Sequence, residues 1–312
     1  MATKPSSSSF FSFLKDALLL PTRNPKLFVP VFLLVAIPTI LINVTNVLAI
    51  QPLTQDIMLR INEIKNVDPS SPEYARLMEE MMKELRALVI IAIAMTIIVA
   101  VLGFVKQIVA FFAASSTYSG DRYSLLELVT KVIMSGHRLR GPVITIALVG
   151  ALDVACVMLL VSLLQLLMRQ SSMAFAFLLL LPAFAAFLYI NVFFTVAVAV
   201  SVADEGRRGV GALRQAWRLM TQARRKEGCV LVVVVHLLGA APSPLYAVAL
   251  GLAKRSVAMG LALLVVYALI SAAVQLFYMA AAMVYCHQAM ETKTATANDF
   301  GYIKIPTGEA NA

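Results

Sequence analysis

Long apolar runs separated by polar connections dominate the chain and set the expected fold. Runs of about 20 residues with few charges match the roughly 30 Å hydrocarbon layer at 1.5 Å of helix rise per residue. We place six membrane spans at 27–49, 87–112, 142–168, 173–203, 229–252 and 257–287. The short alternating segments of a transmembrane β-barrel are missing from the sequence. The pattern therefore predicts an all-α, polytopic bundle of six transmembrane helices.

A second, shorter pattern precedes spans one, three and five. Apolar residues recur there at positions i, i+3, i+4 and i+7, which places them on one face of a helix. The three sets are Phe10, Phe13, Leu14 and Ala17; Leu125, Leu128, Val129 and Val132; and Leu213, Ala216, Trp217 and Met220. We therefore expect three units, each a cytoplasmic interfacial helix followed by a transmembrane hairpin. The alternative is chance convergence of three amphipathic helices.

The connection between the first two spans, residues 50–86, is the longest polar segment. Ser71 is a suitable N-cap residue and Pro72 suits the first position of a helix. Tyr74, Leu77 and Met81 then form an apolar stripe that leads into span two. We expect an extracytoplasmic helical hairpin. It either packs on itself in solvent or binds a protein partner.

The distribution of charge sets the expected orientation. The chain of 312 residues is 60% hydrophobic and 14% charged, and its net charge is +9. The connections on the side of both termini carry 17 Lys and Arg residues, and those on the other side carry 8. The positive-inside rule then places both termini in the cytoplasm. We expect a cytoplasmic leader with an interfacial helix at 1–26, a membrane domain at 27–287 and a flexible cytoplasmic tail at 288–312, in the endoplasmic reticulum or plasma membrane rather than an organelle envelope.

The most basic segment lies just before span five, in the interfacial helix expected near 209–228. Its counterpart before span three is expected near 123–140. The residues that we expect at the lipid surface are Arg214, Trp217, Arg218, Arg224, Arg225 and Lys226. Trp in an apolar stripe opposite Arg is typical of a helix that lies in the membrane interface. The segment therefore predicts contact with membrane lipids, chiefly anionic headgroups of the cytoplasmic leaflet, and gives no support to nucleic-acid binding.

Five polar residues lie at similar depth within the spans. They are Lys106, Asp153, Asn191, His236 and Gln275. Polar side chains inside a membrane are costly and usually face the bundle interior, where they find partners. One hypothesis is a polar site or proton relay in which Asp153 pairs with Lys106 or His236. The other is that these groups only join the helices by hydrogen bonds.

Span five also contains the sequence "GAAPSPLY", with Gly239, Pro242 and Pro244. Two prolines so close together remove backbone donors and should bend or break the helix. A broken span sometimes marks the binding site of a transporter. A plain proline kink is the alternative interpretation.

Enzymatic motifs are missing from the sequence. It has no GxSxG elbow, no HExxH and no phosphate-binding glycine loop. Its three cysteines form no metal-binding pair. We therefore expect no enzyme activity, no metal and no cofactor.

The segments "FFSFLKDALLLPTRNPKLFVPVFLL" and "GALRQAWRLM", with the order of the spans, carry a resemblance. Over nearly its whole length the chain resembles a plant family of six-span membrane proteins without an established activity. It is more distantly similar to the membrane domain of some bacterial glycerophosphodiester phosphodiesterases. The resemblance implies a stand-alone membrane module, with no phosphodiesterase catalytic domain and no catalytic residues to carry over.

Three functions are compatible with these features. The first is a non-enzymatic membrane protein that acts through lipid or protein contacts in membrane organisation, trafficking or assembly. The second is a transporter of small solutes or ions that uses the polar layer around Asp153 and the broken fifth span. The third and weakest is a lipid-modifying membrane enzyme.

Overall fold

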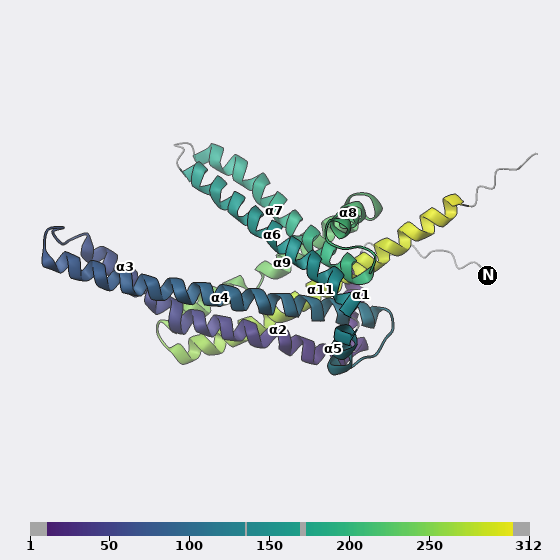
Figure 1. The fold of residues 1–312 in the computed structure, drawn as a ribbon, viewed down its shortest axis with the longest axis horizontal. Helices are drawn as coiled ribbons and strands as arrows, with labels where there is room; N and C mark the ends of the chain where they lie inside the picture. Colours follow the sequence, from purple (N-terminus) through teal and green to yellow (C-terminus); the bar gives the residue numbers. More distant parts are fainter. Residues whose placement is uncertain (1–10, 135, 169–172, 302–312) are drawn as a thin grey trace, which may run out of the picture. The chain divides into compact units, whose positions relative to one another are not determined.

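The computed structural model describes residues 11–134, 136–168 and 173–301, and all regular secondary structure in these ranges is helical (Figure 1). Within these described ranges, six stretches are long and apolar enough to cross a membrane. They are Pro25–Ile64, Pro72–Tyr118, Gly136–Leu167, Leu178–Ala203, Arg225–Ala253 and Val257–Thr292. These stretches confirm the all-α class and the six spans predicted from the apolar runs.

The helices extend beyond the apolar runs that predicted them. In chain order they are α1 (Ser12–Arg23), α2 (Pro25–Thr45), η1 (Asn46–Ile50), α3 (Gln51–Ile64), α4 (Pro72–Tyr118), α5 (Leu125–Met134), α6 (Gly136–Met168), α7 (Met173–Ala203), α8 (Val210–Arg218), η2 (Leu219–Ala223), α9 (Arg225–Ala240), α10 (Ser243–Ala253) and α11 (Val257–Gly301). The elements η1 and η2 are single π-helical turns. Residues 288–301, where a flexible tail was expected, continue α11, and residues 302–312 lie outside the described part of the chain.

The described residues form two compact units. Unit 1 comprises those within Met1–Phe28, Ala110–Leu237 and Phe277–Ala312. Unit 2 comprises Val29–Val109 and Leu238–Leu276. In unit 1, α6 and α7 run side by side (Figure 1).

Unit 2 is held together by small residues and a few polar bonds. Ala272 packs against Val35 and Ala36 at one level, and Ala249 packs against Val47 and Leu264 at another. Small side chains allow membrane helices to approach closely. The Nδ2 atom of Asn46 donates a hydrogen bond of 2.8 Å to the Tyr246 hydroxyl. These contacts join α2 and η1 to α10 and α11.

The polar connection between spans one and two forms the expected pair of helices, α3 and the start of α4. The Ser71 hydroxyl accepts a hydrogen bond from the Tyr74 amide at 3.1 Å, which confirms Ser71 as the N-cap. Arg60 on α3 pairs with Glu80 and Glu84 on α4. In the turn between them, hydrogen bonds from Ser70 lower the pKa of Asp68. The two helices therefore pack against each other.

Helices form in all three segments for which interfacial helices were expected. In α1, Phe13, Ala17 and Leu20 are buried, and in α5 so are Leu128 and Val132. The expected helix near 123–140 is divided between α5 and the start of α6. That near 209–228 is divided among α8, η2 and the start of α9.

Helix α8 buries a face of small and polar side chains and leaves Trp217 exposed. Ala212, Gln215 and Ala216 are buried, whereas Trp217 is 53% exposed. Small alanines let the helix approach its neighbours, and the bulky indole lies beside them at the edge of the packed face. There the Trp217 ring meets Phe193 edge-on, with 5.9 Å between centroids. Trp217 is thus exposed at the surface of unit 1, and its expected contact with lipid stays a prediction.

Candidate functional site

The predicted polar layer is divided between the two units. In unit 2, the Lys106 Nζ atom donates a hydrogen bond of 2.8 Å to Oε1 of Gln275. This bond joins α4 to α11 and gives the lysine a partner within its own unit. Asp153, Asn191 and His236 belong to unit 1. The structure thus brings together Lys106 and Gln275 from the predicted set.

Asp153 lacks the ion pair that was expected for it. Its Oδ1 atom is buried and has no hydrogen-bond partner among the described residues, and no described ion pair includes this carboxylate. Nδ1 of His236 lies 2.8 Å from the Val232 carbonyl, which makes that nitrogen a donor within its own helix. Among the described residues of unit 1, Asp153 and His236 are therefore not paired, and Lys106 belongs to unit 2.

A polar bridge joins α7 to α11 in unit 1. The Tyr278 hydroxyl donates to Oγ1 of Thr195, and Thr195 donates to the Asn191 carbonyl at 3.1 Å. One of the two hypotheses for the polar layer was that its groups only join the helices by hydrogen bonds. The bond between Tyr278 and Thr195 is of this kind. Neither Thr195 nor Tyr278 was singled out from the sequence, because an isolated hydroxyl in an apolar run gives no periodic signal.

The fifth span is interrupted at the predicted position. Helix α9 ends at Ala240, residues 241 and 242 are a turn, and α10 begins at Ser243. Pro244 lies in the first turn of α10, where the missing amide hydrogen costs nothing. Gly239 lies within α9 with open space around its Cα. The two prolines therefore divide the span into two helices.

The basic residues before span five have two different environments. Arg214, Arg218, Arg225 and Lys226 are exposed, as is Trp217. Arg224 is different, because only 18% of its side chain is exposed. Its guanidinium bonds Glu227 at 2.9 Å, Gln288 at 3.1 Å and Thr292 at 3.1 Å. Arg224 therefore joins helices within the protein, which corrects its assignment to the lipid surface.

The contacts of Arg224 belong to a larger junction around Tyr285. Tyr285 on α11 is fully buried, and its hydroxyl donates to the Leu219 carbonyl of η2 at 3.1 Å. Its ring meets Phe13 of α1 edge-on, with 6.0 Å between centroids. One turn further along α11, Nε2 of Gln288 donates to the Asp16 carboxylate at 3.1 Å. Helices α1, η2, α9 and α11 are thus fixed to one another.

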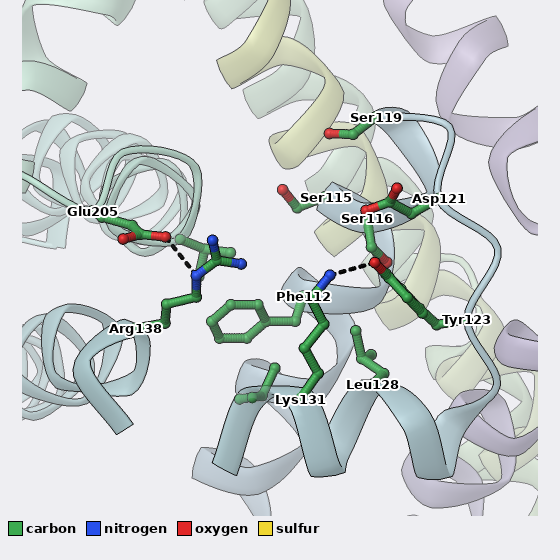
Figure 2. A pocket seen from close by; sticks show the side chains of 12 residues that line it. Phe112, Ser115, Ser116, Ser119, Asp121, Tyr123, Leu128, Lys131, Arg138 and Glu205 are labelled. Atoms are coloured by element: carbon green, nitrogen blue, oxygen red, sulfur yellow. Dashed lines mark hydrogen bonds and ion pairs between the residues drawn. The ribbon is translucent and has the colours of Figure 1, made fainter. Parts of the chain in front are cut away.

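A polar pocket lies in unit 1 among the end of α4, α5, the start of α6 and the end of α7 (Figure 2). Its volume is about 150 Å³. It is lined by Phe112, Ser115, Ser116, Ser119, Asp121, Tyr123, Leu128, Lys131, Val132, Arg138, Val202 and Glu205. No pattern in the sequence indicated this pocket. The serines and charged residues in the connection between spans two and three were the only available signal.

Two contacts fix the charged groups of this pocket. Arg138 of α6 pairs with Glu205 at 2.7 Å, and the Lys131 ammonium donates to the Tyr123 hydroxyl (Figure 2). The ammonium also lies 4.2 Å from the centroid of the Tyr123 ring, a cation–π arrangement.

The N-terminus of α5, which carries Lys131, is fixed by a capping box. The Ser124 amide donates to the Glu127 carboxylate at 2.8 Å, and the Glu127 amide lies 3.4 Å from the Ser124 hydroxyl. These bonds lower the pKa of Glu127. The carboxylate therefore stays ionised at neutral pH, and the helix that positions Lys131 begins at a defined residue.

No group of three or more His, Cys, Asp and Glu side chains among the described residues could hold a metal ion. The cysteines Cys156, Cys229 and Cys286 are free thiols. What the described chain offers for chemistry is a mixed-charge pocket, an exposed basic surface on α8 and α9, and a half-buried aspartate on α6, Asp153.

One comparison with known proteins gives a match. A family model described as "Domain of unknown function (DUF8558)" matches residues 7–287. No curated protein and no solved structure matches the chain. The similarity to plant proteins and to bacterial phosphodiesterase membrane domains therefore stays an expectation from the sequence.

Proposed function

We propose that this chain, which belongs to the DUF8558 family of unknown function, is a non-enzymatic multi-pass membrane protein that acts through lipid contacts in membrane organisation, trafficking or assembly. The observation that carries the proposal is the surface formed by Arg214, Trp217, Arg218, Arg225 and Lys226, which we call the α8 surface. All five side chains are exposed, while the opposite face of α8 is packed inside the protein. Exposed cations beside an exposed indole suit an anionic membrane surface.

The orientation that we propose follows from charge. The connections that contain α1, α5, and α8 with the start of α9 carry most of the lysine and arginine, which supports a cytoplasmic position for them and for both termini. We propose that these helices lie in the interface as three repeated units, each followed by two spans. The endoplasmic reticulum or the plasma membrane is the proposed location.

The α8 surface carries a built-in reporter, because Trp217 is the only tryptophan of the chain. We expect phosphatidylglycerol brominated near the headgroup to quench Trp217 more strongly than brominated phosphatidylcholine in proteoliposomes. Each exposed cation contributes about 1 kcal/mol near an anionic surface, so changing both Arg214 and Arg218 to Gln removes about 2 kcal/mol. The double variant should show a clearly smaller preference for the anionic lipid, because of the four exposed cations only Arg225 and Lys226 remain.

The matched control is Arg76→Gln, which removes one exposed charge from the start of α4. This variant should keep the preference of Trp217 for the anionic lipid. Equal quenching of the unchanged protein by both lipids would overturn the proposed lipid contact. So would a double variant that retains the full preference.

Transport of a small ion is a second candidate function, supported by the buried, unpaired Oδ1 atom of Asp153 and by the interruption of span five. If Asp153 carries protons, proteoliposomes should show voltage-driven proton uptake with an internal pH dye. Asp153→Asn should abolish this uptake, because an amide cannot exchange a proton. Asp56→Asn on α3, which removes an exposed carboxylate, should leave it unchanged. If the unchanged protein takes up no protons, proton transport is excluded as its function.

A further inference from the structure

The pocket of Figure 2 combines equal numbers of positive and negative side chains. Lys131 and Arg138 are the cations, and Asp121 and Glu205 are the anions, so the formal charge of the lining is zero. Arg138 is paired with Glu205 on one side, whereas no described side chain pairs with the Asp121 carboxylate on the other (Figure 2). A ligand with a single negative charge would meet two carboxylates here. A ligand that carries both charges meets a partner for each.

The pocket has one side that favours a cation and another that favours an anion. Helix α4 ends at Tyr118, and a residue with φ of +89°, Gly120, turns the chain back so that the Asp121 amide bonds the Ser116 carbonyl at 2.9 Å. The C-terminus of a helix is its negative end and favours a cation. Lys131 and Arg138, the two cations of the lining, come from α5 and α6 on the other side of the pocket. An ammonium is therefore favoured near Asp121, and a phosphate is favoured between Lys131 and Arg138.

Hydroxyl groups complete the lining between these two ends. Ser115, Ser116 and Ser119 lie along the end of α4 on one side of the pocket (Figure 2). The Ser116 hydroxyl already donates to the Ala113 carbonyl at 3.2 Å, and Oγ of Ser115 lies 3.3 Å from Nε2 of His287. A serine oxygen that donates its proton elsewhere can still accept a hydrogen bond from an ammonium group. A cavity of about 150 Å³ holds a group the size of benzene, and a phosphate with a short amine is of that order.

An apolar groove lies beside the pocket along α5. It shares Tyr123 and Lys131 with the pocket, and its other lining residues are Leu126, Glu127, Thr130 and Met134. Leu126 is 77% exposed and Met134 is 82% exposed. Large apolar side chains so fully exposed at the mouth of a polar pocket suit a ligand with a polar head and an apolar body.

We infer that this pocket binds the headgroup of a zwitterionic aminophospholipid, of the phosphoethanolamine type, with its acyl chains along the exposed side of α5. The phosphate lies between Lys131 and Arg138, and the primary ammonium faces Asp121 and the serine hydroxyls. A primary ammonium has three donors for such acceptors, whereas a choline headgroup has none. The inference rests on the proposed lipid-contacting function, because the pocket must open at the membrane surface.

The test is lipid retention by the purified full-length protein. Delipidated protein is incubated in detergent with an equimolar mixture of phosphatidylethanolamine, phosphatidylcholine and phosphatidylglycerol, and bound lipid is counted by native mass spectrometry. We expect one phosphatidylethanolamine to be retained preferentially. Asp121→Asn should lower the ratio of retained phosphatidylethanolamine to phosphatidylglycerol about tenfold, the effect of removing one charge-assisted hydrogen bond.

Lys131→Gln tests the phosphate contact. It removes a phosphate contact common to all three lipids, so retention of each should fall about tenfold while their ratios stay near those of the unchanged protein. Asp56→Asn, an exposed change on α3, should alter neither retention nor ratio. A variant that fails to fold would lose all lipids, which differs from the change of preference expected for Asp121→Asn.

Three outcomes would overturn the inference. They are equal retention of the three lipids by the unchanged protein, an Asp121→Asn variant with an unaltered ratio, and displacement of the lipid by inorganic phosphate alone. The proposed function has a separate test. Quenching of Trp217 by anionic lipid reports on the α8 surface and not on the pocket. Changing Arg214 and Arg218 should leave retention of phosphatidylethanolamine unaltered, and Asp121→Asn should leave Trp217 quenching unaltered.

Discussion

Replacing Gly260 with alanine is expected to destabilise unit 2 by about 3 kcal/mol, the upper end of the cost of forcing an extra methyl group into a packed core. Gly260 is buried at the start of α11, against the end of α10. A Cβ atom at this position would lie 2.5 Å from both Cα and Cβ of Ala253 and 2.7 Å from its backbone nitrogen. Because backbone atoms cannot rotate away as a flexible side chain can, the turn between the two helices must move.

Gly251→Ala is the matched control for this substitution. Gly251 lies within α10 of the same unit, and no heavy atom approaches within 4 Å of its Cβ position. Alanine there should be neutral or stabilise the helix by about 0.5–1 kcal/mol. Equilibrium unfolding in mixed detergent micelles measures both variants. Equal stability of the two would contradict the close approach of α10 and α11.

The spans and the α3–α4 pair could be predicted because their signals are local. An apolar run of sufficient length has no other stable arrangement in a membrane, and the N-cap function of Ser71 depends on its immediate neighbours. The interruption of span five was equally local, since Pro242 and Pro244 remove donors from their own helix. Helix α4 continues unbroken from Pro72 to Tyr118 because no proline interrupts the junction between its polar and apolar parts.

The roles of individual polar residues depended on partners far away in the sequence. Arg224 resembles its exposed neighbour Arg225 in every local respect, yet its guanidinium contacts Gln288 and Thr292 some 64 and 68 positions away. Lys106 and Gln275 were placed at similar depth from helix rise alone, and the structure supplies the bond between them. Depth follows from counting residues, but the direction in which a side chain points depends on how the helices are rotated.

The polar pocket shows the same limit. Its lining comes from four helical elements, and its charged groups are spaced irregularly along the sequence. Periodicity predicts the face of a helix that is buried, and here it correctly placed Leu128 and Val132 of α5 on that face. It does not show which loop residues return to meet that helix. Asp121 and Glu205 therefore gave no signal of a common site before the structure placed them together.

Substitution of Tyr285 by alanine is expected to have the largest effect of any single change at the α8 end of unit 1. Truncating a fully buried aromatic ring typically costs about 3–5 kcal/mol through lost burial and the remaining cavity. Here it also leaves the Leu219 carbonyl without the hydroxyl that bonds it at 3.1 Å, and it removes the edge contact with Phe13. Hydrogen exchange of residues 210–223 and unfolding in mixed micelles would measure the loss.

Tyr285→Phe separates the ring from the hydroxyl. It keeps the packing against Phe13 and removes the hydrogen bonds of the hydroxyl, so it should cost about 1 kcal/mol, because the Leu219 carbonyl still accepts the Arg224 amide at 3.2 Å. Because η2 holds α8 against the protein through this bond, both variants should accelerate exchange in α8, with alanine the stronger. Trp217 should then lose its preference for anionic lipid in the alanine variant although every cation of the α8 surface is still present. If hydrogen exchange in α8 is faster but Trp217 still prefers anionic lipid, the cations bind lipid without needing α8 to be held in place.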